Sequence, residues 1–258
     1  MITSTANPKV KWVRALQLKR KAREEERLFV VEGIRLAREA VAAGVPARLV
    51  MHTETLDARG RGLANSLARL GAEVELVSES VMAACSDTDT PPGLLAVVER
   101  PDLPFPQALT LALVADGLAD PGNLGTTLRT ALAAGAQAFF LAGDTVDPFN
   151  PKVVRGAMGA HFHIPIRKLA AGEAAAALAG LHVWLAEAAE GGIPYYAVDW
   201  RAPSAVIIGS EAGGPGALTR ELAADRTHIP ISPASESLNA AVAAAVILFE
   251  IARQRGSP

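Results

Sequence analysis

Three short segments in the second half of the chain carry residue types that could do chemistry. They are residues 116–129 (DGLADPGNLGTTLR), 208–216 (IGSEAGGPG) and 229–242 (IPISPASESLNAAV). In each of them, apolar residues typical of a buried strand give way to a turn rich in Gly, Pro, Asn or Ser. Ligands of α/β proteins bind where strands end in such turns and helices begin. Three such junctions in one half of the chain predict one composite site.

The first segment offers an amide and a guanidinium. Asn123 is a candidate helix N-cap, and Arg129 follows six residues later, about one and two-thirds helical turns along. This spacing would hold the guanidinium near the mouth of the turn. An ordinary capping residue followed by a surface arginine explains the same pattern equally well.

The second and third segments offer backbone and hydroxyl groups. Residues 213–216 contain three glycines, so the backbone there can approach a flat ligand closely. Ser235, Ser237 and Asn239 stand at the entrance to the last helix, where hydroxyls and free N–H groups converge. A plain turn and a simple capping cluster are the alternatives, and neither accounts well for so many suitable residues.

Several familiar motifs are missing from the sequence. It contains neither the Gly-rich dinucleotide fingerprint nor a P-loop, and Ser210 has no evident histidine partner for nucleophilic catalysis. His161 and His163 lack a third ligand, so we expect strand residues there and no metal site. The single cysteine, Cys85, excludes an internal disulfide.

Positive charge is concentrated at the N-terminus, although the whole chain has a net charge of −2. Residues 1–40 hold ten Lys or Arg against five Asp or Glu. Such a density favours a polyanion such as RNA, because each phosphate contact releases counterions. The candidate RNA-binding residues are Lys9, Lys11, Arg14, Lys19 and Arg20. The alternative is a solvated helix face, because Glu24, Glu25 and Glu26 follow at once.

The chain reads as an α/β protein of two domains. Helical and strand patterns alternate over residues 1–100, beginning with a helix from Lys9 to about Arg23, and residues 101–108 form a Pro-rich linker. Residues 109–258 then show apolar strands typical of a parallel sheet, at 110–115, 138–142, 183–186, 205–209 and 228–231. No stretch reaches the roughly 18 apolar residues of a membrane span. We therefore expect a cytoplasmic protein without a membrane segment.

The last helix, at about residues 238–253, is apolar on nearly every face. Such a helix must be buried all round. It lies either under the rest of its domain or against a second copy of the chain, which makes a homodimer a reasonable expectation.

The three segments carry a family resemblance. DPGNLGTTLRTALAAG, IIGSEAGGPG and IPISPASESLNAAVAAAVILFE resemble, in order and spacing, the three motifs of the SpoU (TrmH-type) RNA 2′-O-ribose methyltransferases of the SPOUT class. The N-terminal stretch ITSTANPKVKWVRALQLKRKAREEERLFVVEGIRLAREAV resembles the substrate-binding domain of that family, which is similar to the ribosomal protein L30e. Nearly the whole chain is covered.

The resemblance implies a fold, an oligomeric state and a cofactor. The N-terminal domain would be an L30e-like α/β domain, and the C-terminal domain a trefoil-knotted SPOUT methyltransferase domain with a parallel sheet. Knots are almost absent from proteins, so sequence patterns alone would not suggest one. The family implies a homodimer and S-adenosylmethionine as cofactor, with no metal. The residues that match cofactor-binding motif positions are Gly209, Ile229 and Leu238, and those that match positions serving RNA and chemistry are Asn123, Arg129, Glu211, Ser237 and Asn239.

The implied reaction is in-line attack of a ribose 2′-hydroxyl on the sulfonium methyl, which requires positioning and removal of one proton. The family's usual candidate for the base is the arginine matching Arg129. A guanidinium has a pKa above about 12, so we expect Arg129 to hold the target phosphate and orient the ribose.

The substrate follows less directly from the resemblance. The extra N-terminal domain favours large-subunit (23S) ribosomal RNA. A tRNA substrate, or a module that binds RNA or S-adenosylmethionine without catalysis, is the alternative. Ala157 stands where the family often has a serine, and nearby Arg155 is either a phosphate contact or half of a structural ion pair.

Overall fold

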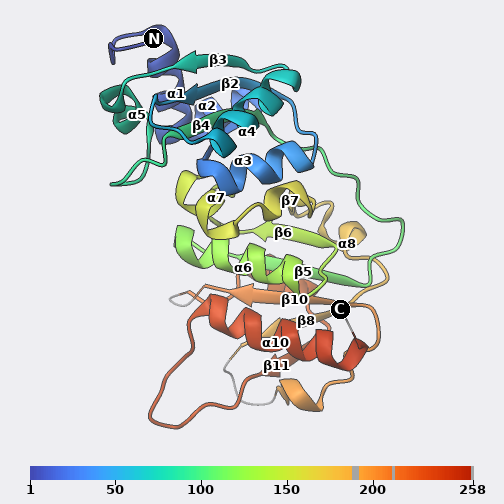
Figure 1. Cartoon of the computed structure of the whole chain (residues 1–258). Helices are drawn as coiled ribbons and strands as arrows, with labels where there is room; N and C mark the ends of the chain where they lie inside the picture. The colour runs from blue at the N-terminus through green and yellow to red at the C-terminus, as the bar shows by residue number, and fades with distance from the viewer. Residues whose placement is uncertain (188–191, 211–212, 257–258) are drawn as a thin grey trace. The chain divides into compact units, whose positions relative to one another are not determined.

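The computed structural model describes residues 1–187, 192–210 and 213–256, and the chain divides into two compact units (Figure 1). The first unit comprises Met1–Asp102 and Asp147–Phe162, and the second comprises Leu103–Val146 and His163–Pro258. The chain therefore passes between the units three times. One passage lies in the Pro-rich segment 101–108, whereas nothing in the sequence indicated that residues 147–162 pack with the first unit.

The first unit is built on a four-stranded sheet in the order β1-β4-β2-β3. These strands are β1 (Leu28–Glu32), β4 (Leu94–Glu99), β2 (Ala47–His52) and β3 (Glu73–Leu76). β4 is antiparallel to both of its neighbours, and β2 and β3 are parallel. Because side chains alternate along a strand, Phe29 and Val31 enter one hydrophobic core while Leu28 and Val30 enter the other.

Helices cover both faces of this sheet. α3 (Gly33–Ala42), α4 (Ala58–Arg69) and α7 (Pro151–Ala157) contribute to the core of Phe29, and α1 (Pro8–Leu18) and α5 (Glu79–Cys85) to that of Leu28. The expectation of one continuous helix from Lys9 to Arg23 is wrong, because extended backbone at Lys19 separates α1 from α2 (Arg20–Glu26). After this bend the Arg23 guanidinium donates to the carbonyls of Leu16 and Gln17, at 2.6 and 3.0 Å, which stabilises the open end of α1.

Residues 147–162 complete the core of the first unit. Val154 and Phe162 are buried there. The ring centroids of Phe149 and Phe162 lie 5.1 and 5.8 Å from that of Phe29. His161 is buried beside them, and its Nε2 lies 2.7 Å from the Pro148 carbonyl.

The expected strand at the two histidines is wrong, because Ala160–Phe162 form one turn of 3₁₀ helix after backbone of positive φ at Met158 and Gly159. Burial lowers the pKa of His161 to about 4, so the ring is neutral at pH 7. The described residues contain no group of side chains able to hold a metal ion.

The second unit contains a seven-stranded sheet in the order β7-β6-β5-β10-β8-β11-β9, and every pairing is parallel. The strands are β5 (Leu111–Asp116), β6 (Ala138–Ala142), β7 (Ile166–Lys168), β8 (His182–Ala186), β9 (Ile193–Pro194), β10 (Ser204–Gly209) and β11 (Asp225–His228). Four of the five strands expected from the apolar runs are present within one residue at each end. The fifth, expected at 228–231, is wrong, since Pro230 has no N–H to continue the ladder and β11 ends at His228.

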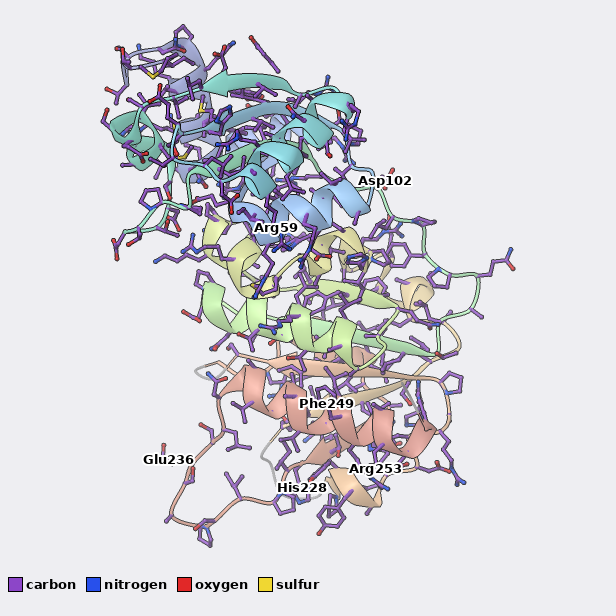
Figure 2. The ribbon with its side chains drawn as sticks, in the orientation of Figure 1. Arg59, Asp102, His228, Glu236, Phe249 and Arg253 are labelled. Carbon is purple, nitrogen blue, oxygen red and sulfur yellow. The ribbon has the colours of Figure 1, made fainter. Side chains whose placement is uncertain are left out.

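α6 (Pro121–Ala133) and α10 (Ala240–Arg255) pack against each other in the second unit, which also holds α8 (Ala174–Ala177), α9 (Ala217–Leu222) and η2 (Tyr195–Ala197). α10 is buried on one side, through residues such as Ala244, Ile247 and Ile251. Val242 and Phe249 are 50 % and 51 % exposed, and Phe249 projects from the outer side of α10 (Figure 2). Burial all round is therefore not reached within one chain. No helix of the described residues is long and apolar enough to cross a membrane.

Candidate functional site

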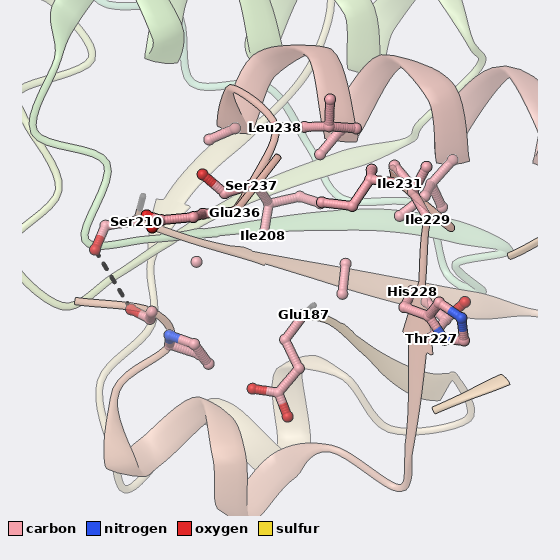
Figure 3. A pocket seen from close by; sticks show the side chains of 17 residues that line it. Glu187, Ile208, Ser210, Thr227, His228, Ile229, Ile231, Glu236, Ser237 and Leu238 are labelled. Carbon is pink, nitrogen blue, oxygen red and sulfur yellow. Dashed lines mark hydrogen bonds between the residues drawn. The ribbon is translucent and has the colours of Figure 1, made fainter. Parts of the chain in front are cut away.

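A cavity of about 310 Å³ lies at the carboxyl ends of three neighbouring strands of the second unit. β10, β8 and β11 are adjacent in the sheet, and each delivers its last residue or residues to the cavity wall. Residues after β10, the loop that leads from β11 to α10, and the first part of α10 form the other sides of the cavity (Figure 3). The second and third sequence segments therefore line one cavity, whereas no residue of the first segment, 116–129, is part of its wall.

The cavity wall includes all three residues that match cofactor-binding motif positions, Gly209, Ile229 and Leu238. Its sides are largely apolar, with Ile208 and Ile231 beside Ile229 and Leu238. In Figure 3, Ser210 lies at the opposite end of the cavity from Ile229. Apolar walls with a few polar groups are typical of small-molecule sites.

The turn after β10 folds back tightly over the end of that strand. The Ser210 carbonyl accepts from the Gly214 N–H at 3.0 Å, and the Ser210 hydroxyl oxygen accepts from the Gly213 N–H at 3.0 Å. At Gly209, an added Cβ would lie 2.6 Å from the nitrogen of Pro215 and 2.8 Å from the carbonyl carbon of Gly214. Only glycine allows this close approach, so the glycine at position 209 has a packing cause.

Gly209→Ala should therefore deform the cavity wall. Overpacking costs about 1–3 kcal/mol, and each 1.4 kcal/mol is a tenfold change. We expect affinity for S-adenosylmethionine to fall about 10- to 100-fold by isothermal titration calorimetry. Gly62→Ala is the control, because its added Cβ meets no atom within 4 Å. Equal affinity of the Gly209 variant and the native protein would contradict this account of the wall.

Glu187 is a cavity residue that sequence reasoning missed. It follows β8 directly, and its side chain is only 11 % exposed. Its Oε2 accepts a hydrogen bond from Nη1 of Arg220 at 3.0 Å. Its Oε1 lies 3.0 Å from Nη1 of Arg226 and forms an ion pair with it, but the geometry of this second contact is not that of a hydrogen bond. Both arginines offset its charge. A carboxylate immediately after a predicted strand, with Gly191 and Gly192 shortly after it, was the available signal.

Asn123 and Asn239 meet beside the cavity. Asn239 caps α10 by accepting from the N–H groups of Ala241 and Val242, and its Nδ2 donates to Oδ1 of Asn123 at 2.9 Å. Leu238 and Ala240, its chain neighbours, both line the cavity. The first and third segments are therefore joined directly.

The expectation that Asn123 is a helix cap is wrong. α6 begins at Pro121, and Asp120 is its N-cap, with Oδ1 accepting from the Asn123 N–H at 2.8 Å. Proline is favoured at the first helical position, where its missing N–H costs nothing. The side chain of Asn123 is thereby left for Asn239.

The other residues expected to serve chemistry lie in different settings. Arg129 is exposed on α6, and no described residue forms an ion pair or hydrogen bond with its guanidinium. Ser237 lines the cavity, so it lies with the expected cofactor residues. Glu211 lies outside the described residues.

The expected RNA-binding residues divide into paired and unpaired groups. Lys9 contacts Glu73 and Glu75, and these hydrogen bonds raise its pKa; Arg20 lies 2.7 Å from Glu24. The remaining three, Lys11, Arg14 and Lys19, are exposed and have no ion-pair partner among the described residues.

Arg155 forms an ion pair within the first unit. Arg155 Nη1 lies 2.6 Å from Oδ2 of Asp87, both about one-third exposed, so the ion-pair alternative is observed. Ala157 is buried in α7. A serine hydroxyl at that position would need a buried hydrogen-bond partner.

Comparison with known proteins gives matches over both parts of the chain. The model of the SpoU rRNA Methylase family matches residues 110–249, and that of the MRM3-like substrate binding domain matches residues 7–96. The 23S rRNA (guanosine(2553)-2′-O)-methyltransferase of Bacillus subtilis is 34% identical over 253 residues, which cover 97% of this chain and 98% of that protein.

Solved structures agree with these matches. An AdoMet-bound rRNA methyltransferase from Sinorhizobium meliloti has a TM-score of 0.87 at 32% identity, covering 98% of this chain and 97% of its own. A SpoU methyltransferase from Streptomyces viridochromogenes, solved in complex with AdoMet, also has a TM-score of 0.87, at 29% identity and 97% and 99% coverage. The chain belongs to the SpoU rRNA methylase family and carries an MRM3-like substrate-binding domain at its N-terminus.

Proposed function

We propose that the protein transfers a methyl group from S-adenosylmethionine to a ribose 2′-hydroxyl of large-subunit ribosomal RNA. The observation that carries the proposal is the cavity at the ends of β10, β8 and β11, directly beside the Asn123–Asn239 pair, in a chain of the SpoU family. The relatives from Bacillus subtilis and Sinorhizobium meliloti are both named as rRNA methyltransferases.

The cavity fits the cofactor in its chemistry. Its volume of about 310 Å³ lies within the roughly 300–1,000 Å³ typical of small-molecule sites. Ile229 and Leu238 give apolar surface for an adenine ring, and the turn after Gly209 presents backbone groups at close range. When bound, S-adenosylmethionine supplies an electrophilic methyl on a positively charged sulfur.

The chain's own residues would position the RNA for this chemistry. A free guanidinium can bind a phosphate through two parallel N–H donors, and Arg129 is exposed and unpaired among the described residues. The Asn239–Asn123 bond fixes the start of α6, the helix that carries Arg129, relative to the cavity loop. Arg129 would thus hold the target phosphate and orient the ribose beside the cavity.

The first unit would select the RNA. Lys11 and Arg14 lie three residues apart on α1, hence on one face, and Lys19 follows at the end of that helix. These exposed cations are free to contact phosphates, whereas Lys9 and Arg20 would first have to leave their carboxylates. We also infer a cytoplasmic location, where bacterial ribosomal RNA is found.

We infer that the protein works as a homodimer through the open side of α10. Val242 and Phe249 are seven residues apart, about two helical turns, so they share one face. Both are about half exposed, and large apolar side chains grouped on one surface indicate an interface. A second copy of α10 would complete the burial of this helix.

The proposed function is tested by transfer of labelled methyl from S-adenosylmethionine to ribosomal subunits, total rRNA and tRNA in parallel. We expect label in 23S rRNA, recovered as an alkali-resistant dinucleotide because a 2′-O-methyl group blocks cleavage by the 2′-hydroxyl. Label in tRNA alone would identify the tRNA alternative. Cofactor binding without transfer to any of these RNAs would favour a non-catalytic binding module.

A further inference from the structure

Asp116, the last residue of β5, is a buried carboxylate outside the cavity wall. It is 2 % exposed, and no cation forms an ion pair with it among the described residues. Removing a charge from water is costly unless its oxygens receive hydrogen bonds. The groups that donate hydrogen bonds to this carboxylate are therefore the parts of the chain that Asp116 holds in place.

The two donors to Asp116 come from the last residue of the second segment and from the helix that follows it. Its Oδ2 accepts from the Gly216 N–H at 2.6 Å and from the Thr219 hydroxyl. Gly216 precedes α9, and Thr219 lies in the first turn of that helix. A residue of β5 thereby fixes a turn that begins at the end of the neighbouring strand, β10.

Glycine packing holds the carboxylate itself. A Cβ added at Gly143, which follows β6, would lie 2.5 Å from Oδ1 of Asp116. At Gly216 an added Cβ would lie 3.4 Å from Oδ2. The carboxylate is therefore confined between the ends of β6 and β10, which flank β5 on its two sides.

The turn that Asp116 holds is a wall of the cavity. Ser210, Gly214 and Pro215 line the cavity, and Gly216 follows at once. The turn is fixed at one end by β10, and the Asp116 hydrogen bonds fix the other end. Loss of these bonds would let the wall shift without changing any residue that lines the cavity.

We propose that Asp116 is a positioning residue that sets the shape of the cofactor cavity by fixing Gly216, which directly follows the cavity residues Gly214 and Pro215. The proposal rests on the proposed function, because it takes S-adenosylmethionine as the occupant of the cavity. The Asp116 side chain also links β5, which ends at the start of the first segment, to Gly216 at the end of the second segment. Asp116 acts through Gly216 and Thr219.

Paired variants test this role. Thr219→Val removes one donor and keeps the side-chain shape, and Thr219→Ser restores the hydroxyl. A hydrogen bond to a charged group contributes enough that its loss changes an equilibrium about tenfold or more. We expect Thr219→Val to weaken S-adenosylmethionine binding about tenfold by calorimetry, and Thr219→Ser to stay within about twofold of the native protein. In methyl transfer, Thr219→Val should raise KM for the cofactor and leave kcat nearly unchanged.

A second pair approaches the carboxylate from the other side. Gly143→Ala places a methyl group against Asp116, whereas Gly180→Ala introduces a similar positive-φ strain with no atom within 4 Å of the added carbon. We expect only Gly143→Ala to weaken cofactor binding, although both lower the thermal unfolding midpoint.

The outcomes separate the inference from the proposed function. Native-like cofactor affinity in Thr219→Val and Gly143→Ala would overturn the positioning role of Asp116. Equal losses in Gly180→Ala or Thr219→Ser would also overturn it, because general destabilisation would then explain the effect. Absence of S-adenosylmethionine binding by the native protein would instead refute the proposed function, and the positioning role would fall with it.

Discussion

Replacing Arg129 by alanine should reduce methyl transfer about 100- to 1,000-fold, with little change in affinity for S-adenosylmethionine. The guanidinium is exposed on α6 and is not part of the cavity wall, so it is available to RNA. Loss of a group that positions the reactants or stabilises charge in the transition state costs about 10²–10³-fold or more. Single-turnover methylation of ribosomal RNA and calorimetry of cofactor binding measure the two quantities separately.

Two further variants sharpen this test of Arg129. Arg129→Lys keeps the charge but loses the two parallel donors of the guanidinium, so we expect it to recover only a small part of the rate. Arg201→Ala is the matched control, since Arg201 is exposed, pairs locally with Asp199 and lies outside the cavity wall. If Arg129→Ala lost cofactor affinity in proportion to its rate, the assignment of Arg129 to the RNA side would be wrong.

The sequence predicted the cavity better than it predicted the detailed contacts. Gly209, Ile229 and Leu238 were assigned by motif position, and all three line the cavity. Gly209 and Ile229 reach it because β10 and β11 end at the same edge of the parallel sheet, and Leu238 reaches it through the loop before α10. Their role in cofactor binding stays a prediction. The trefoil knot and the homodimer stay predictions.

Local hydrogen bonding was harder to predict. The sequence indicated a helix start near Asn123. Asp120 and Asn123 are both suitable N-cap residues and Pro121 is suitable as the first helical residue, so only the backbone conformation shows that Asp120 is the cap. Charge density suggested RNA contacts at Lys9 and Arg20. The nearby Glu24, which pairs with Arg20, supported the alternative of a solvated helix face, but no local pattern indicated the partners of Lys9. Glu73 is 64 residues from Lys9, so no local pattern relates the two.

The part of the first unit formed by residues 147–162 could not be read from the sequence. Residues 147–162 follow β6 of the second unit, yet Val154 and Phe162 are buried in the core of the first. Removing residues 1–100 would expose both side chains to water. Point substitutions are therefore a cleaner way to test the first unit than truncation.

Arg23→Ala should destabilise the first unit by about 3–5 kcal/mol, the typical cost of leaving one member of a buried ion pair without its partner. The side chains of Arg23 and Asp147 are 3 % and 6 % exposed, and Nε and Nη2 of Arg23 both lie 2.7 Å from Oδ2 of Asp147. The variant also removes the donors to the carbonyls of Leu16 and Gln17 at the end of α1. Asp147 would remain as a buried, uncompensated charge.

Hydrogen–deuterium exchange followed by mass spectrometry can report the effect of Arg23→Ala on each unit separately. Peptides from β1 and α7 should lose protection, while those from β5 and β10 should keep it, because the paired residues both belong to the first unit. Arg20→Ala is the control, since its ion pair with Glu24 is about half exposed, and exposed pairs contribute little. Adding Asp147→Asn to Arg23→Ala should recover part of the protection, because the uncompensated charge is gone. Equal loss in both units would mean that they unfold as one, and residues 147–162 would then not report on the first unit alone.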